Sequence, residues 1–397
     1  MTQFVVPEGI GRLPSRITCH FGGFTADQWR NWITIYSPVL LWQMIDDQQW
    51  NCWMMFVQAV KVISGRILSL AEVTKADDLI VKFCQAFQQL YGDKDCTPNM
   101  HMHLHLIQSL TDYGPAHGFW LYAFERYNGI LGSYHTNNIR VESQMMRRFL
   151  ESQSTSISME TLELMDNEFR EVLPKHCSSE AVNSPLGNVN AIKLLTAASG
   201  PINNFEIEIH RVFYSMVSSI GPFKEHVLTA LEVESMVEVL QNIFEPGVTL
   251  KSKFSLKFGK LMIGDDLIGS ALPNCSLNSS VILAYWPGSL LSGDVDFNVG
   301  KVQYYLDVTF THAQTTAEVR QIFAFVHWLR PHQRRDAFPK DVAIICETRA
   351  YPMCKWSYLP VHRILKRCAH ITLPLKLSEH VTETVTIACP ISLRLNL

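Results

Sequence analysis

The sequence predicts an α+β multidomain protein, with a mostly α-helical N-terminal two thirds followed by a small β-rich, barrel-like C-terminal domain. Apolar residues recur at three- and four-residue spacing up to about residue 244, which is typical of amphipathic helices. From about residue 250 the apolar segments become short, aromatic or β-branched, and turn residues separate them. A chain of 397 residues also exceeds the size at which a single core stops growing, about 250–300 residues. We therefore expect two or three domains, with a boundary near residue 250.

The N-terminal part is expected to be helical after an extended lead-in. Residues 1–24 are rich in Gly and Pro and have too few apolar residues for a core of their own. Thr25 is a good N-cap for the first helix, and Pro38 is expected to interrupt it. Two further helices are expected over residues 50–68 and 76–91, with Trp and Phe on their core-facing sides. Residues 25–150 thus form one expected helical segment.

Residues 151–250 are expected to be an acidic helical linker region. Ser152–Ser158 reads as a polar linker, 159–173 as an amphipathic helix, and 175–205 as a loop. A second helix is expected over residues 224–244, and Pro246-Gly247 would end it.

Residues 251–397 are expected to form the basic β-rich domain, as a compact barrel or sandwich of about six strands. Gly264-Asp265-Asp266 and Gly293-Asp294 are expected turns. The six strands are expected in the segments KFSLKFGKLMIG, SSVILAYW, GKVQYYLDVTFTH, QIFAFVHWL, DVAIICET and TVTIACPISLRL.

Charge is unevenly distributed along the chain. Residues 151–250 carry 5 Lys/Arg against 14 Asp/Glu, whereas residues 251–397 carry 17 against 11. The excess favours a C-terminal part that faces a polyanion, although ordinary variation in surface charge explains it equally well. None of the ten cysteines forms a two-residue-spaced pair, which indicates free thiols in a reducing compartment. No signal peptide or apolar run of about 18 residues is found, so we expect an intracellular protein without a membrane span.

The densest chemistry lies between Cys96 and Phe149, where five of the fifteen histidines fall between His101 and His135. His101, His103 and His105 would share one face of a strand, whereas on a helix His101 and His105 would share a face. Either arrangement could bind a metal, and the alternative is that these imidazoles form hydrogen bonds in a packed interior.

Glu125 lies in an aromatic run, between Phe124 and Arg126. A buried carboxylate must be paired or must bind a cation. The two interpretations are a structural ion pair with Arg126 or Arg140, and a metal-binding acid in a dry pocket.

Two basic clusters in residues 251–397 are candidate DNA-binding sites, and both lie near Trp328 or Trp356, which could stack on bases. The alternative is an exposed, solvated set of side chains. The first cluster contains Arg330, His332, Arg334 and Arg335, and the second, at helical spacing, contains Arg363, Lys366, Arg367 and His370.

The run MHMHLHL…DYGPAHGFWLYAFERYNGILGSYHTNN…VESQMMRRFL resembles the transposases of the CACTA (En/Spm) superfamily. The likeness extends to IGRLPSRI and FTADQWRNWITIYSPVLL upstream, and to IFAFVHWLRPHQR and LPVHRILKRCA downstream. It implies an RNase H-like nuclease core in which three acids hold two divalent cations. Glu125 matches the third acid and metal ligand, and His105 matches a histidine that precedes it. The first two acids belong upstream of Met1, and Glu8 is the one acid within residues 1–24.

The resemblance therefore implies a transposase-derived nuclear protein that lacks a complete acid triad. As the chain stands we expect no cofactor, because one carboxylate cannot hold two Mg²⁺ ions; Mg²⁺ is expected only with a complete triad. The retained activity would be DNA or chromatin association. The alternatives are a protein-interaction module or homo-oligomer that uses open helical faces around Trp29, Trp32 and Trp53, and a working transposase subunit whose missing acids come from elsewhere.

Overall fold

The computed structural model contains two compact units. The first, which we call the sheet unit, combines residues 1–118 and 185–397, and the second, the inserted unit, is residues 119–184. These units differ from the four consecutive segments expected at 1–24, 25–150, 151–250 and 251–397. The structure describes residues 4–11, 24–66, 68–136, 140–162, 216–243, 248–285, 297–312, 318–352, 355–377 and 381–393.

The helices of the sheet unit begin where the sequence provides caps. Thr25 accepts a hydrogen bond from the Gln28 backbone in a capping box, as expected, and Asp46 and Ser69 cap the two longest helices. The α-helices are α1 (Ala26–Asn31), α2 (Ser37–Leu41), α3 (Asp47–Ile63), α4 (Leu70–Tyr91), α5 (Pro98–His103), α6 (Leu106–Tyr113) and α11 (Ala230–Ile243), with a π-helical turn η2 (Trp32–Tyr36). Short 3₁₀ turns are η3 (Asp93–Asp95), η4 (Ala116–Gly118), η8 (Leu277–Ser279), η10 (Lys355–Ser357) and η11 (Val361–Arg363). Pro38 lies in the first turn of α2, so it does not end the helical stretch.

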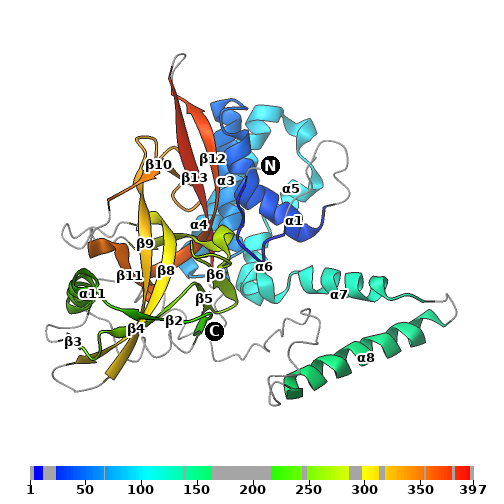
Figure 1. Ribbon diagram of the computed structural model, residues 1–397. Helices are drawn as coiled ribbons and strands as arrows, with labels where there is room; N and C mark the ends of the chain where they lie inside the picture. The colour runs from blue at the N-terminus through cyan, green and yellow to red at the C-terminus, as the bar shows by residue number, and fades with distance from the viewer. Residues whose placement is uncertain are drawn as a thin grey trace. The chain divides into compact units, whose positions relative to one another are not determined.

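The strands of the sheet unit form a ten-stranded antiparallel sheet and a three-stranded sheet within the described residues (Figure 1). The large sheet has the order β11-β9-β10-β13-β12-β7-β8-β4-β2, with β3 on β8 and a further pairing of β8 with β9, and the small one has the order β1-β5-β6. The strands are β1 (Val217–Ile220), β2 (Lys224–Val227), β3 (Val248–Leu250), β4 (Phe254–Phe258), β5 (Lys260–Ile263), β6 (Asp266–Ile268), β7 (Val281–Tyr285), β8 (Phe297–His312), β9 (Glu318–Pro331), β10 (Ile344–Ala350), β11 (Tyr358–Pro360), β12 (Ile364–Lys376) and β13 (Thr382–Ser392).

The expected fold class is therefore wrong in its proportions and in the form of its β region. Among the described residues the first strand is β1 at Val217 rather than one near residue 250, and the strands build a large antiparallel sheet rather than a small barrel-like domain. The expected helix over residues 224–244 is strand β2 followed by helix α11. The short polar strand Lys224–Val227 lacks apolar alternation, so its sequence does not distinguish it from the helix that follows.

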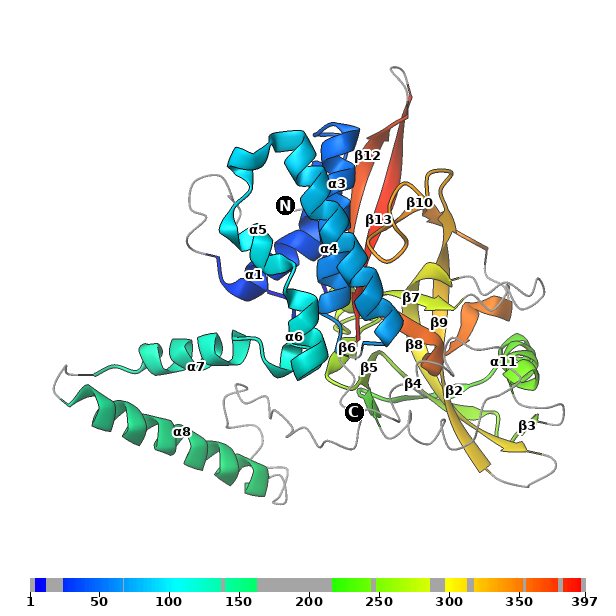
Figure 2. The same cartoon turned by 180° about the vertical axis from the view of Figure 1, so that it is seen from behind.

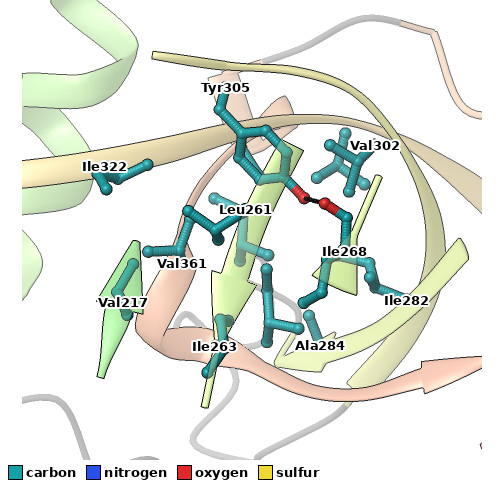
Figure 3. Close-up of a cluster of buried hydrophobic side chains, with 14 of the residues drawn as sticks. Val217, Leu261, Ile263, Ile268, Ile282, Ala284, Val302, Tyr305, Ile322 and Val361 are labelled. Carbon is teal, nitrogen blue, oxygen red and sulfur yellow. Dashed lines mark hydrogen bonds between the residues drawn. The ribbon is translucent and has the colours of Figure 1, made fainter. Parts of the chain in front are cut away.

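The first core lies between the small sheet and strands β7, β8 and β9 (Figure 3). Leu261 and Ile263 of β5 face Ile282 and Ala284 of β7, and every one of these side chains is fully buried. Tyr305 crosses this core, and its hydroxyl donates toward the Gly269 carbonyl at 3.3 Å. Because the phenol is completely buried, its pKa is raised well above the ordinary value.

A second core joins the N-terminal helices to strands β12 and β13, which lie side by side in both views (Figures 1 and 2). Val57 of α3 packs with Ile371 of β12 and Ile387 of β13. Lys61 on the same helix is half-buried, and its ammonium donates to the carbonyl oxygens of Asp341 (2.8 Å), Val342 (3.2 Å) and Pro390 (3.1 Å). Desolvation lowers the Lys61 pKa to about 8. The helical layer is thereby fixed to the sheet by both apolar and polar contacts.

The lead-in also belongs to the sheet unit. Val5 exchanges two backbone hydrogen bonds with His370 of β12, at 2.8 and 2.9 Å. The Glu8 carbonyl accepts a hydrogen bond from Arg367 at 2.9 Å. The first described segment therefore pairs with β12, an interior strand that lies between β13 and β7 in the large sheet.

The inserted unit contains helices α7 (Tyr122–Ser133) and α8 (Val141–Leu162). The expectation of a polar linker at Ser152–Ser158 is wrong, because these residues belong to α8. The helix expected over 159–173 lies mostly outside the described residues, as do the loop at 175–205 and the turn at Gly293-Asp294. Within the described parts of the chain, no helix has both the length and the apolar character needed to cross a membrane.

Each of the six expected C-terminal segments contains a strand, but the first, residues 253–264, forms two strands, β4 and β5. The Gly264-Asp265 turn joins β5 to β6 with Gly264 at a φ of +58°. The seven cysteines within the described residues are free thiols, as expected. Burial raises the pKa of Cys346 and Cys389 to about 12, so these two thiols are inert.

Candidate functional site

Glu125 lies in the first turn of α7, and its side chain is exposed. Its neighbour Phe124 is also exposed, with 66% of its surface accessible. The expectation that Glu125 lies in a dry pocket is therefore wrong. The alternative pairing with Arg126 falls outside the described side chains.

The histidine run is helical, so His101 and His105 share a face and His103 does not. The His105 Nε2 atom lies 3.2 Å from the His101 Nε2 atom, and the two rings meet edge to face. His103 packs on Phe56 with ring centroids 5.4 Å apart, and burial lowers its pKa. The run thus divides into an exposed imidazole pair and a packed third member.

The first basic cluster lies at the end of β9 and in the loop that leads to β10. Arg334 is exposed, whereas Arg330 is half-buried, 5.7 Å from the centroid of the Tyr351 ring. Arg335 is half-buried as well, and His332 is buried beside Glu383 at 3.3 Å. Arg334 is therefore the member of this cluster most accessible to a polyanion.

The second basic cluster is not a helix, because it forms η11 and the start of β12. Arg363 is 7% exposed, and desolvation lowers its pKa to about 10. Arg367 is buried against Asp266 in an ion pair, and Lys366 is half-buried. In this conformation Arg363 and Arg367 cannot contact a nucleic acid. The charge of Arg367 is paired with buried Asp266 instead.

Neither expected stacking residue presents an open aromatic face. Trp328 is 1% exposed, and its indole Nε1 donates to the Trp356 carbonyl at 2.8 Å. The Trp356 side chain is half-buried and packs against the core that contains Phe325 and Tyr358. The open helical faces expected around Trp32 and Trp53 are likewise covered, because both side chains pack against the second core.

A buried polar network that the sequence did not reveal surrounds Glu232 at the start of α11. Its carboxylate accepts a hydrogen bond from the Thr229 backbone at 2.8 Å and lies 3.0 Å from His226 Nε2. The Tyr304 hydroxyl donates to it at 3.3 Å, and Lys257 lies over the Tyr304 ring at 3.5 Å.

Two opposing effects set the pKa of Glu232. Burial alone would raise the pKa, but hydrogen bonds from Thr229 and His226 lower it below the ordinary value. Desolvation raises the pKa of Tyr304 to about 12, so the phenol stays a donor. The network fixes α11 to β2 and β8. The three-residue spacing of Thr229 and Glu232, which is typical of a capping box, is the one signal in the sequence that could have indicated this network.

On the opposite face of β2, apolar side chains remain exposed. Val227 pairs with Phe254 of β4, and Glu225 pairs with Leu256, so these four residues share one face. Val227 is 60% exposed and Phe254 is 69% exposed. Phe223 precedes β2 and contacts Phe258 of the same face, with ring centroids 5.7 Å apart. We call Phe223, Glu225, Val227, Phe254 and Leu256 the β2 face.

No family of proteins, curated protein or solved structure matches this chain. Within the described ranges, no group of three or more His, Cys, Asp or Glu side chains is arranged to hold a metal. The geometry of the site is therefore the basis on which a function can be argued.

Proposed function

We propose that this chain is a transposase-derived binding module that docks an extended segment of a partner protein along β2. The transposase origin is supported by the sequence run that contains Glu125, and the docking role by the β2 face. β2 is the last strand in the order of the large sheet. A terminal strand offers backbone N–H and C=O groups to an added strand, and exposed apolar side chains beside it mark interaction sites.

The chemistry of the β2 face favours one kind of occupant. Glu225 lies between Phe223 and Val227 on the same face, because side chains two residues apart in a strand share a face. An added antiparallel strand would place one residue opposite each of these three. A Lys or Arg opposite Glu225, with an apolar residue two positions to either side, complements all of them.

A second copy of this chain fits less well. In a symmetric antiparallel pairing that matches Phe223 with Val227 of the copy, Glu225 would lie opposite its own symmetry mate. Like charges directly opposite each other destabilise a strand pair. We therefore propose that the partner is a different protein, with a segment in which apolar, basic and apolar residues occupy alternate positions.

The direct test uses two labelled synthetic peptides and the full chain. One peptide has the sequence Thr-Val-Thr-Lys-Thr-Val-Thr, and the other has Glu in place of Lys. Fluorescence anisotropy should show roughly fivefold tighter binding of the Lys peptide, the upper value for one cross-strand charge pair. Glu225→Lys should reverse this preference, and Val227→Asp with Phe254→Asp should abolish both interactions.

The matched control is Leu70→Asp, which changes an exposed apolar residue in the first turn of α4 and should leave peptide binding unchanged. An unchanged preference in Glu225→Lys would remove the docking proposal. Salt-dependent binding of a labelled DNA duplex that is lost in Arg334→Ala, without peptide binding, would replace it with DNA association. Mg²⁺-dependent nicking of plasmid DNA that is lost in Glu125→Ala would show a working nuclease instead.

A further inference from the structure

We propose that His101 and His105 form a two-histidine site for a divalent transition-metal ion, of the Ni²⁺, Cu²⁺ or Zn²⁺ class. His101 lies in α5, and His105 follows that helix and caps α6. Both side chains are exposed, so an ion can reach them from solvent. Imidazole nitrogens are preferred ligands of these metals.

The separation of the two nitrogens fits such an ion. A metal–nitrogen bond of about 2.0–2.1 Å and a tetrahedral angle place two ligand nitrogens about 3.3 Å apart. The two Nε2 atoms are 3.2 Å apart, so tenths of an ångström separate the observed pair from a chelating pair. Without a metal, one ring must donate an N–H to the other, and that proton occupies the position that the ion would take.

The backbone around the pair supports a fixed geometry. The Leu104 N–H donates to the His101 carbonyl at 3.1 Å, and the His105 N–H donates to the Met102 carbonyl at 3.1 Å. The intervening His103 is packed on Phe56, which fixes the rotation of this turn. The two ligands are therefore presented on an ordered scaffold rather than on a free loop.

The remaining coordination positions would be filled from outside the pair. Among the side chains that the structure describes, no third His, Cys, Asp or Glu completes a cluster here. Water, or a carboxylate or imidazole of another molecule, would complete the shell. A site with open positions exchanges its ion readily and differs from a closed structural zinc site.

Isothermal titration of the full chain with NiCl₂ tests the proposal, because Ni²⁺ prefers imidazole to carboxylate. We expect His101→Ala and His105→Ala each to lower the affinity for one equivalent of Ni²⁺ by at least about tenfold. A tenfold loss is the smallest that is typical even when a residue supporting a metal ligand is removed. His135→Ala, which removes another exposed imidazole, should bind like the parent chain. Far-UV circular dichroism of each variant separates a lost ligand from a lost fold.

Thermal unfolding gives a second readout. Ni²⁺ should raise the Tm of the parent chain and of His135→Ala, and the rise should disappear in His101→Ala and His105→Ala. If all four proteins bind Ni²⁺ with the same affinity, the pair only shares a proton and the metal site does not exist.

Discussion

The guanidinium of Arg367 and the carboxylate of Asp266 form an ion pair inside the sheet unit, with side-chain exposures of 2% and 0%. Asp266 begins β6 of the small sheet, whereas Arg367 lies in β12 of the large one. The pair therefore joins the two sheets by a charged contact from which water is excluded. The Glu8 carbonyl is a further acceptor for Arg367.

Breaking this pair should strongly destabilise the sheet unit. Arg367→Met leaves the Asp266 carboxylate buried without its cation, and we expect a loss of about 3–5 kcal/mol in the free energy of unfolding. The double variant Arg367→Met with Asp266→Leu should lose clearly less, because it removes both charges. Urea denaturation of the single and double variants measures the difference. Equal losses would mean that the charges are solvated.

Lys61 should stabilise the folded sheet unit through the hydrogen bonds that it donates to three backbone carbonyls. Lys61→Met keeps the apolar stem in place but leaves the carbonyls of Asp341, Val342 and Pro390 without this donor. We expect a loss of about 1–3 kcal/mol in urea unfolding. Lys82→Met removes an exposed lysine that pairs with Asp78 on α4 and should change stability by less than about 1 kcal/mol. A similar loss in both variants would contradict the role of Lys61.

His370 should make the protein sensitive to acid. Desolvation, with a smaller effect of Lys301, lowers its pKa to about 4, and its Nδ1 is buried without a hydrogen-bond partner. In the unfolded chain its pKa is about 6.5, so below that pH the unfolded state binds the proton first. This contribution is complete above pH 6.5 and falls by up to about 3 kcal/mol as the pH approaches 4.

His370→Gln should therefore flatten the decline of stability between about pH 6.5 and pH 4. Urea unfolding at several pH values measures the slope, and His135→Gln, at an exposed position, should follow the parent chain. Parallel curves for the parent chain and His370→Gln would show that His370 has the same pKa in the folded and unfolded states.

Gly269 should tolerate no side chain. A Cβ at this position would overlap the carbonyl oxygens of Cys275 and Ser276, which are backbone atoms that cannot rotate away. Gly269→Ala should lose about 1–3 kcal/mol. Gly129→Ala in α7 has open space around its Cβ and should instead gain about 0.5–1 kcal/mol of helix stability. Equal and small effects at both positions would show that the segment near Gly269 shifts easily.

Periodicity predicted the elements whose side chains alternate cleanly and missed those in which polar groups are buried. Helices α3 and α4 and strands such as β8 show a continuous apolar face, so they were found. The helical spacing of the basic residues at the start of β12 is misleading, because this segment is a strand and Arg367 is directed inward, where it meets Asp266. The sequence gives no sign of that partner, since a different strand supplies it.

Candidate sites that depend on local spacing can be predicted from the sequence, whereas those that depend on contacts between distant segments cannot. The pairing of His101 with His105 follows from helical spacing alone, and the structure has it. The β2 face could not be predicted, because Val227 and Phe254 become neighbours through strand pairing. The burial of Arg363 likewise depends on packing that distant segments provide.

The sheet unit is interrupted in sequence, which affects how it can fold during synthesis. Trp32 and Trp53 find their apolar partners on β12 and β13, which the ribosome makes more than 300 residues later. Synthesis proceeds at about 5–20 residues per second, so roughly 15–60 s pass before β12 and β13 exist to bury these aromatic side chains. During that interval the nascent N-terminal helices expose apolar side chains, so we expect the nascent chain to bind chaperones.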